Sequence, residues 1–474
     1  MPSDDLCWLS ASELAERYAR RELSPVEVID AHLARAERLN PHLNAFITLL
    51  PEAARAAARR AEQELARGER RGPLHGVPVA LKDIVNTRGV RTTMGSRIYA
   101  EFVPDEDSTV AARLAAAGAI LLAKANTHEF AHGATTNNPH YGPCRNPWDR
   151  RRIPGGSSGG SGAAVGAGLV PIAIGTDTGG SIRLPALLCG VVGLMATYGL
   201  VSRYGVHPLS WTLDHAGPLT RTVRDAAVVL SVLAGYDPRD PTTMRVAVPD
   251  YSAALTGDVR GLRVGVVPER AAGPFDDDVR LAFDAALAQL GELGAIVEEV
   301  SIPSVVHAPM ISNIVVEVEA AAVHEHLLRE RLADYGVDVR NRLLAGFAIS
   351  GLDYVRAQQA RSRIIADVRD ALERCDVLVG PTAPIAAPFI GQQTVVLGGQ
   401  EQRVLTALSR FTRLDNLTGC PAITVPCGYT RGGLPTGLHV SGRPRDEATV
   451  LRVADAYERA TAHARRQPPL DDLA

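Results

Sequence analysis

The stretch of residues 154–204 constrains the fold of this chain more than any other. Its glycines and serines are interleaved with apolar runs of Ala, Val, Leu and Ile, as in residues 169–174. Flexible glycine-serine linkers do not carry such runs, so we expect the stretch to be buried. Within it, Ser157 and Ser181 each follow a pair of glycines and are candidates for reaction chemistry.

The composition indicates a soluble globular protein. The chain has 474 residues, a formal net charge of −3 and 46% hydrophobic residues, which allows a large core. The balanced charge gives no electrostatic reason to expect nucleic acid or a membrane surface as partner, so a small-molecule substrate is expected. Residues 184–202 are uncharged and long enough to cross a bilayer, but their Pro and Gly content argues against a membrane span.

Cysteine usage and the N-terminus favour a reducing compartment. Six cysteines are scattered without a Cys-x-x-Cys pair, so neither a zinc site nor a disulfide framework is expected. The start MPSDDLCW is acidic and lacks a basic segment followed by an apolar one, so no signal peptide is visible. We therefore expect a cytoplasmic monomer or homodimer without a metal or cofactor.

Alternating helix and strand signals predict an α/β fold with a mixed central β-sheet flanked by helices. Capping signals start helices at Ser10 and Ser24, and the second helix is expected to stop at Asn40-Pro41. The other expected helices are 51–67, 108–117, 222–233, 275–293 and 446–461, and the expected strands are 43–50, 77–81, 120–123, 169–174, 262–267, 296–302, 377–380, 419–426 and 437–440. We expect one domain over residues 1–474, with a core of about 60–240 and 375–474 and an insertion of about 245–374.

Familiar nucleophile and phosphate motifs do not account for the glycine-rich stretch. Residues 155–159, GGSSG, match the Gly-x-Ser-x-Gly nucleophile elbow, but that motif needs a preceding apolar strand, and residues 146–154 are charged and broken by prolines. An α/β-hydrolase with a Ser-His-Asp triad is therefore disfavoured. Neither the GxxxxGK[ST] phosphate loop nor the GxGxxG order occurs, which disfavours nucleotide binding.

A serine nucleophile without an evident histidine needs another base, and a lysine held neutral can serve. Lys82 is the candidate because it ends an apolar run, and burial would have to lower its pKa from about 10.4 to about 7. On spacing alone, Lys82 could instead pair with Asp83, or Lys124 could be the functional lysine. The turn 175–181, GTDTGGS, can converge backbone N–H groups as an oxyanion hole requires, or it can be an ordinary capped turn.

Several long motifs together resemble the amidase signature family. They are GGSSGGS at 155–161, GTDTGGSIR at 175–183 and GVVGL at 190–194. The resemblance extends over nearly the whole chain, through GVPVALKD at 76–83, EFAHGATT at 129–136, SRYG at 202–205, LDHAGP at 213–218, DVLVGPT at 376–382 and NLTGCPA at 416–422. It implies a single amidase-signature domain.

The resemblance also implies an amidohydrolase with a Ser-cisSer-Lys triad. Ser181 would be the nucleophile, Ser157 the bridging serine after a cis peptide bond, and Lys82 the base. The proton of Ser181 would pass through Ser157 to neutral Lys82 and return to the leaving amine, and water would then hydrolyse the acyl-enzyme. The backbone amides of Thr178, Gly179, Gly180 and Ser181 would form the oxyanion hole, and Asp177 and Arg183 would hold the loop.

The chain departs from the family pattern at two places near these motifs. After Leu194 it has Met195-Ala196-Thr197, where the family most often has Lys-Pro-Thr, and Leu187-Leu188 is bulkier than the small residues common there. Both departures bear on the packing and the shape of the acyl pocket and leave the triad untouched.

Three functions are compatible with these features. We favour a free-standing amidase that acts on a small or aryl amide, or on a similar carbamate, urea or ester bond. The alternative is the glutaminase subunit of the tRNA-dependent amidotransferase, which typically carries an Asp seven residues before the position of Asn416, where this chain has Ser409. The third is a catalytically silent binding protein on the same fold. The segments 127–141, 202–211 and 307–359 are expected to line the substrate pocket.

Overall fold

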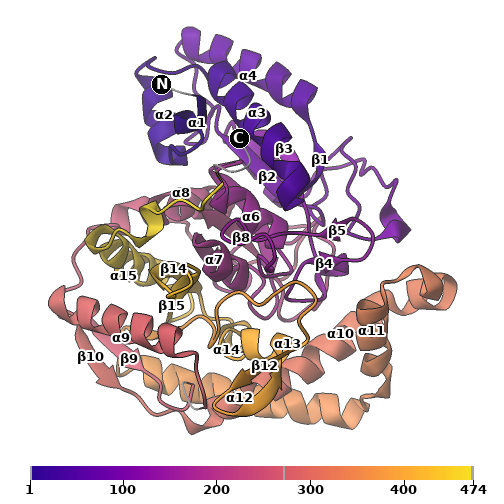
Figure 1. Cartoon of the computed structure of the whole chain (residues 1–474), viewed down its shortest axis with the longest axis vertical. Helices are drawn as coiled ribbons and strands as arrows, with labels where there is room; N and C mark the ends of the chain where they lie inside the picture. The colour runs from indigo at the N-terminus through magenta and orange to yellow at the C-terminus, as the bar shows by residue number, and fades with distance from the viewer. Residues whose placement is uncertain (1–2, 271–272, 471–474) are drawn as a thin grey trace.

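An 11-stranded β-sheet forms the centre of the protein, and the computed structural model describes residues 3–270 and 273–470 (Figure 1). Its strands are β1 (Phe46–Leu49), β2 (Pro78–Lys82), β3 (Ile120–Ala125), β6 (Ile172–Asp177), β7 (Val192–Met195), β8 (His215–Thr220), β9 (Arg263–Val266), β10 (Ile296–Glu299), β11 (Val377–Pro381), β14 (Ala422–Tyr429) and β15 (Pro435–Gly442). They follow the order β1-β3-β2-β6-β8-β7-β14-β15-β11-β9-β10. Parallel pairs lie at β3-β2-β6 and β11-β9-β10, and the remaining pairs are antiparallel. The predicted mixed sheet in an α/β fold is confirmed.

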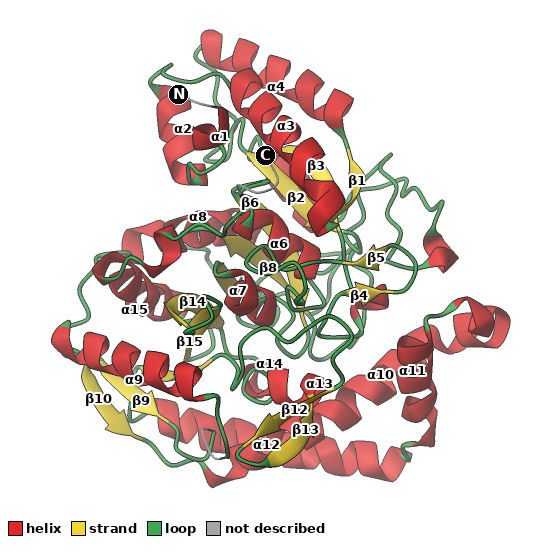
Figure 2. Cartoon of the chain, viewed as in Figure 1, coloured by secondary structure: helices red, strands yellow, loops and turns green. Residues whose placement is uncertain are grey.

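Helices cover the sheet on both faces and extend beyond its edges (Figure 2). The helices are α1 (Ser3–Leu6), α2 (Ala11–Ala19), α3 (Pro25–Leu43), α4 (Pro51–Ala66), α5 (Thr109–Ala116), α6 (Gly159–Gly166), α7 (Arg183–Cys189), α8 (Val223–Leu233), α9 (Asp277–Glu292), α10 (Ala308–Arg331), α11 (Val337–Ala348), α12 (Gly351–Leu372), α13 (Val404–Leu408), α14 (Arg413–Thr418) and α15 (Glu447–Ala460). Two short hairpins, β4 (Asn137–Asn138) with β5 (Gly142–Pro143) and β12 (Thr394–Leu397) with β13 (Gln400–Arg403), lie outside the main sheet.

Local signals located the helix starts well and one helix end poorly. Ser10 and Ser24 both form the predicted capping boxes at the starts of α2 and α3. The expected stop at Asn40-Pro41 is wrong, because α3 continues to Leu43. Pro41 lies inside the helix, where it removes one backbone hydrogen bond, yet the helix continues for two further residues. Asn44, with φ of 51°, closes the helix and donates its backbone N–H to Asn40 O at 2.7 Å.

The glycine-rich stretch folds as two buried helices flanking a buried strand. All residues of α6, β6 and α7 are buried, as predicted. The expected strand 169–174 instead lies at Ile172–Asp177, closer to the predicted loop. Gly160 shows why glycine is needed here: a Cβ at this position would lie 2.4 Å from the backbone N and O of Asn126. The helix therefore packs directly against the main chain that follows β3.

Residues 245–374 contribute both strands and helices. β9 and β10 join the main sheet beside β11, while α10, α11 and α12 form the arm at the lower edge of Figure 1. The division into a core and an insertion stays a prediction. Among the described residues, only Pro303–Asp334 is long and apolar enough to cross a membrane, and half of its most apolar window is buried inside the protein. A core helix of a soluble protein passes the same test, and α10 packs against α11 and α12.

Candidate active site

Two neighbouring parallel strands bring the candidate residues together. Lys82 is the last residue of β2, and the loop that carries Ser181 follows the end of β6. β2 and β6 pair in parallel, with Leu81 opposite Ile174. Because parallel strands end at the same edge of a sheet, the lysine and the loop meet there.

Lys82 contacts two hydroxyl groups inside the protein. Its Nζ donates to Ser157 Oγ at 2.7 Å and to Thr176 Oγ1 at 2.7 Å. The side chain is fully buried, and burial lowers the pKa of Lys82 to about 7 although Asp214 and Asp177 act in the opposite direction. A lysine with this pKa is partly neutral at physiological pH and can accept a proton.

The surroundings of Asp83 and Lys124 bear on two alternatives, a Lys82–Asp83 pair and Lys124 as the functional lysine. Asp83 accepts the backbone N–H of Thr93 at 2.9 Å and lies 3.7 Å from Lys124 Nζ. Lys124 donates to Val85 O at 2.6 Å and to Thr92 Oγ1 at 2.7 Å. The Asp83 carboxylate therefore lies beside Lys124, and Lys82 contacts Ser157 instead of Asp83.

Ser157 lies on a loop that is tied to the nucleophile loop. The peptide bond between Gly156 and Ser157 is cis, as the resemblance implied. The next residue, Ser158, joins the two loops: its backbone N–H donates to Ser181 O at 3.3 Å, and its Oγ donates to Thr176 O at 3.1 Å. Thr176 N–H donates back to Ser158 Oγ at 3.1 Å. Sequence analysis missed both Ser158 and Thr176, although both lie inside the quoted motifs.

Asp177 holds the nucleophile loop through a buried network. Its carboxylate accepts hydrogen bonds from Gly180 N at 2.7 Å and Ile182 N at 3.0 Å, and it pairs with Arg183 Nη2 at 3.0 Å. Burial opposes its ionisation, but the Arg183 guanidinium holds the pKa of Asp177 well below its usual range. Asn416 Nδ2 completes the network at 3.0 Å from Asp177 Oδ1. Asp177 and Arg183 thus contact each other and this loop, and their role in supporting the reaction stays a prediction.

The same network changes the expected oxyanion hole. The Gly180 N–H points to Asp177 rather than to a shared donor site. The backbone amides of Thr178, Gly179 and Ser181 make no hydrogen bond to other residues that the structure describes. Three of the four expected donors therefore remain candidates, and Gly180 is better explained as part of the brace.

The two departures from the family pattern, at Met195-Ala196 and at Leu187-Leu188, are buried in the protein. Met195 Sδ accepts a hydrogen bond from Asn416 Nδ2 at 3.2 Å. Leu187 and Leu188 pack in an apolar cluster that also contains Leu184 and Leu408. Their added bulk therefore packs α7 against α13.

Two chambers adjoin the site. The first, here called the nucleophile chamber, has a volume of about 60 Å³ and is lined by Ser181, Gly179 and the polar residues His132, Glu317, Arg342 and Arg413. The second, here called the aromatic chamber, has a volume of about 170 Å³ and is lined by Thr176, Ile84, Val206, His207 and Trp211. Ala131, Thr178 and Leu209 line both. Each of the three segments expected to line the pocket contributes to at least one chamber.

The comparison with known families agrees with the geometry. The pattern of the family described as Amidase matches residues 27–451. The chain belongs to the amidase family. It is thus an amidase-signature protein with one domain of this type, as the sequence motifs indicated.

Curated relatives within the amidase family carry an amidotransferase name. The chain is 44% identical over 490 residues to a glutamyl-tRNA(Gln) amidotransferase subunit of Chloroflexus aggregans, covering 98% of this chain and 99% of the relative. The Geobacillus kaustophilus protein of the same name is 42% identical and covers 97% and 99%. These relatives do not support the preference for a free-standing enzyme over an amidotransferase component.

Solved structures in the amidase family include enzymes with other substrates. An s-triazine catabolic enzyme, described with a vestigial protein complex, is 35% identical with a TM-score of 0.92, covering 95% of this chain and 98% of that one. A bacterial aryl acylamidase of the amidase signature family is 29% identical with a TM-score of 0.89, covering 97% and 98%. The fold alone therefore does not select a substrate.

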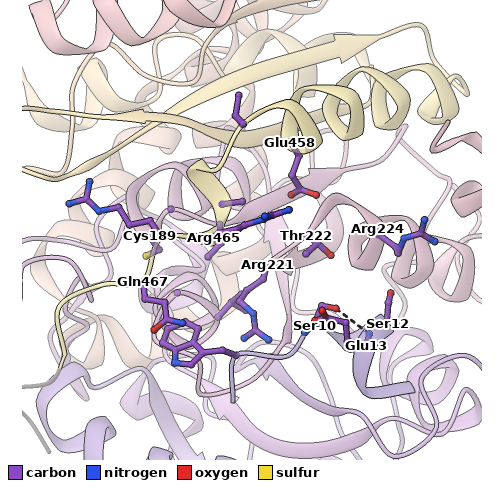
Figure 3. Close-up of a pocket in the computed structure, with 18 of the residues that line it drawn as sticks. Ser10, Ser12, Glu13, Cys189, Arg221, Thr222, Arg224, Glu458, Arg465 and Gln467 are labelled. Carbon is purple, nitrogen blue, oxygen red and sulfur yellow. Dashed lines mark hydrogen bonds between the residues drawn. The ribbon is translucent and has the colours of Figure 1, made fainter. Parts of the chain in front are cut away.

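A cavity larger than the two chambers lies elsewhere in this amidase-family chain. It has a volume of about 600 Å³ and opens between the N-terminal segment, the start of α8 and the end of α15 (Figure 3). Lys82, Ser157 and Ser181 do not line it. Glu458 points into it and accepts the backbone N–H of Val223 at 3.1 Å, and burial raises the pKa of Glu458 to about 8. Its position at the far ends of α6 and α7 separates it from the serines.

The described part of the chain contains no group of side chains that could bind a metal ion. Within residues 3–270 and 273–470, no group of three or more His, Cys, Asp or Glu side chains is arranged to hold an ion. The six cysteines are all buried, and none of them forms a disulfide bond within the described residues.

Proposed function

We propose that the protein hydrolyses a carboxamide-type C–N bond through an acyl-enzyme on Ser181. The observation that carries the proposal is the 2.7 Å contact between Lys82 Nζ and Ser157 Oγ, made by a lysine whose pKa is about 7. A buried neutral amine beside a serine hydroxyl is the base that a serine nucleophile requires. The tie between Ser158 and Ser181 supports the placement of the two loops.

The contact between Lys82 and Ser157 supports one step of the proton path, and the step from Ser181 to Ser157 is part of the proposal. Ser181 Oγ attacks the carbonyl carbon as its proton moves to Ser157 and the Ser157 proton moves to Lys82. The amides of Thr178, Gly179 and Ser181 receive the oxyanion. The proton returns along the same path to the leaving nitrogen, the C–N bond breaks, and water then releases the acid by the same steps in reverse.

A second candidate is the glutaminase reaction of an amidotransferase. It is favoured by the 44% identity to the Chloroflexus aggregans protein, and it would require partner chains. Ser409 argues against it. This residue lines the nucleophile chamber, where its Oγ accepts a hydrogen bond from Arg413 Nε at 3.0 Å. A serine at this position has no negative charge with which to bind the ammonium group of glutamine.

A serine-directed fluorophosphonate tests the proposal. We expect the probe to label Ser181, as located by peptide mass spectrometry, and we expect Lys82→Ala to lose both labelling and amide hydrolysis. Ser362→Ala, an exposed serine on α12, serves as the matched control and should be labelled like the wild type. Labelling at another residue, or undiminished activity in Lys82→Ala, would contradict the assignment.

A further inference from the structure

The aromatic chamber and the nucleophile chamber adjoin each other, because Ala131, Thr178 and Leu209 line both. Ser181 and Gly179 line only the nucleophile chamber, whereas Thr176 lines only the aromatic chamber. Thr176 is the second hydrogen-bond partner of Lys82 Nζ, at 2.7 Å. Ile84, two residues after Lys82, also lines the aromatic chamber. The aromatic chamber therefore lies on the side of the base.

The proposed reaction distinguishes these two sides. The acyl half of the substrate stays bonded to Ser181, so it occupies the chamber that Ser181 lines. The leaving nitrogen must receive the proton that returns from Lys82 through Ser157, so the amine half lies on the side of the base. Position alone thus assigns the nucleophile chamber to the acyl half and the aromatic chamber to the amine half.

The side chains that line the aromatic chamber indicate what kind of amine would bind there. Ile84, Val206, Leu209 and Trp211 offer apolar surface. His207 is neutral at pH 7 because burial lowers its pKa to about 4. Trp211 is 54% exposed at the rim of the chamber, and the Arg203 guanidinium lies over its ring, 5.3 Å from the centroid. An exposed large aromatic side chain beside a cavity is typical of a binding surface.

The charged side chains around the aromatic chamber already have partners. Asp214 accepts hydrogen bonds from Thr178 Oγ1 at 2.6 Å, Leu209 N at 2.8 Å and Ser210 N at 3.0 Å. Arg203 donates to Trp211 O at 2.7 Å, and Asp240 accepts the Arg203 backbone N–H at 2.8 Å. Arg239 pairs with Asp237 at 3.2 Å and stacks on Tyr204. Asp237 and Asp240 are thus paired with arginines, whereas the Asp214 carboxylate has no ion pair among the described residues and is occupied by three neutral hydrogen-bond donors.

The volume of the aromatic chamber fits a ring. It measures about 170 Å³, and an apolar cavity of about 150 Å³ is known to hold benzene. Ammonia, the leaving group of a primary amide, would leave most of this space empty.

We propose that the aromatic chamber binds the amine half of the substrate and that this half is an uncharged aromatic amine. The assignment rests on the proposed function. In the reaction, the bond from Ser181 Oγ to the carbonyl carbon forms, the C–N bond breaks, and the arylamine leaves neutral with the proton delivered through Ser157. Anilides and N-aryl carbamates are the substrate classes with this amine half.

Paired substrates and a filled chamber test the assignment. We expect kcat/KM for acetanilide to exceed that for acetamide by at least tenfold, beyond the difference in their alkaline hydrolysis rates measured without enzyme. Val206→Phe, which fills the chamber, should lower this ratio at least tenfold. Val396→Phe makes the same change on β12 at a side chain that is 70% exposed, and the ratio should stay at the wild-type value. Circular dichroism and thermal unfolding verify that both variants are folded.

Three results would overturn the assignment, and they differ in what they leave standing. Suppose that the wild type reacts with fluorophosphonate at Ser181 and hydrolyses acetamide, but that Val206→Phe lowers kcat/KM for acetanilide and for acetamide equally. The amine assignment then fails and the proposed function stands. If Ser181 is not labelled and neither amide is hydrolysed, the proposed function fails and the amine assignment falls with it. A folded Val206→Phe variant with an unchanged ratio also rejects the assignment, because the added ring would then lie outside the amine path.

Discussion

Asp83 directs its carboxylate to Thr93 and Lys124 and away from its sequence neighbour Lys82. Lys124 pairs with Leu81 across β3 and β2 and shares its face of the sheet, whereas Lys82, the next residue on β2, points to the other face, which places the two buried lysines in separate surroundings. Lys124 has the carboxylate 3.7 Å away, whereas the hydrogen-bond partners of Lys82 are hydroxyl groups. This separation allows Lys82 to lose its proton near neutral pH.

The rate of amide hydrolysis should rise with pH through about 7. Lys82 acts as a base only when neutral, and burial lowers its pKa to about 7. Below that pH, kcat/KM should fall by about tenfold per pH unit, and above it the rate should level off. A pH–rate profile with acetanilide measures this midpoint. A profile that stays flat down to about pH 5 would contradict a lysine base, whose unperturbed pKa lies near 10.4.

Thr176→Val should lower both the rate and the midpoint of that profile. The change removes one acceptor of the Lys82 ammonium group, which favours the neutral form and lowers its pKa, but it also leaves a buried N–H without a partner. An unsatisfied buried donor costs about 1–3 kcal/mol, which corresponds to a fall in kcat/KM of roughly tenfold or more. Thr176→Ser keeps the hydroxyl group and should retain the wild-type midpoint. Equal profiles for the Val and Ser variants would show that the hydroxyl does not act on Lys82.

Asp177→Asn should destabilise the protein strongly. Asp177 and Arg183 are both fully buried, and removing one charge leaves the guanidinium with Asp415 at 2.7 Å as its remaining carboxylate partner. Breaking a buried pair typically costs about 3–5 kcal/mol. Urea unfolding followed by circular dichroism measures the change. Asp258→Asn, in an exposed pair with Arg260, should leave the unfolding midpoint unchanged, and a similar loss in both variants would reject the argument.

Gly160→Ala and Gly291→Ala should shift stability in opposite directions. A Cβ at Gly160 would lie 2.4 Å from backbone atoms of Asn126, so the alanine forces the main chain apart. Gly291 lies near the end of α9 with no neighbouring atom within 4 Å, and alanine there should add up to about 1 kcal/mol through helix propensity. Thermal unfolding of the two variants checks the contrast. A stable Gly160→Ala protein would mean that α6 can move away from β3.

The enzyme should not recognise the amino group of glutamine. L-glutamine and glutaramate, the same amide without the α-amino group, should be hydrolysed with kcat/KM values within about threefold, because Ser409 supplies no carboxylate. A carboxylate that binds the α-amino group would raise kcat/KM for L-glutamine over glutaramate by roughly tenfold or more, since hydrogen bonds to charged groups contribute about 1.5–3 kcal/mol. Assays of ammonia release compare the two substrates. A strong preference for L-glutamine would favour the amidotransferase reaction.

Local sequence signals predicted the parts of the site that depend on local structure. Lys82 could be placed at a strand end, and Ser10 and Ser24 at helix starts, because capping and apolar periodicity act over a few residues. The contact between Asn416 and Asp177 could not be predicted in this way, since 239 positions separate the two residues and only the sheet order brings them together. The direction of the Gly180 N–H is likewise set by the Asp177 carboxylate and not by the glycine motif.

The shapes of the chambers were also beyond the reach of the sequence. The segments 127–141, 202–211 and 307–359 were expected to line a pocket, and residues of all three do so. Their division into two chambers depends on where Thr178 lies between them, which is a property of the folded loop. Apolar residues such as Val206 look the same in a sequence whether they line a cavity or fill a core.

The pairing of β2 with β6 separates the reaction from the choice of substrate. The lysine and the nucleophile loop are positioned by the fixed spacing of two hydrogen-bonded strands, about 4.8 Å. Apart from strand residues such as Thr176, the chamber walls come from loops and helices that the sheet does not hold in register. Insertions or exchanges in those walls can therefore accumulate while the proton path keeps its geometry, and relatives with one chemistry can diverge in substrate without passing through an inactive form.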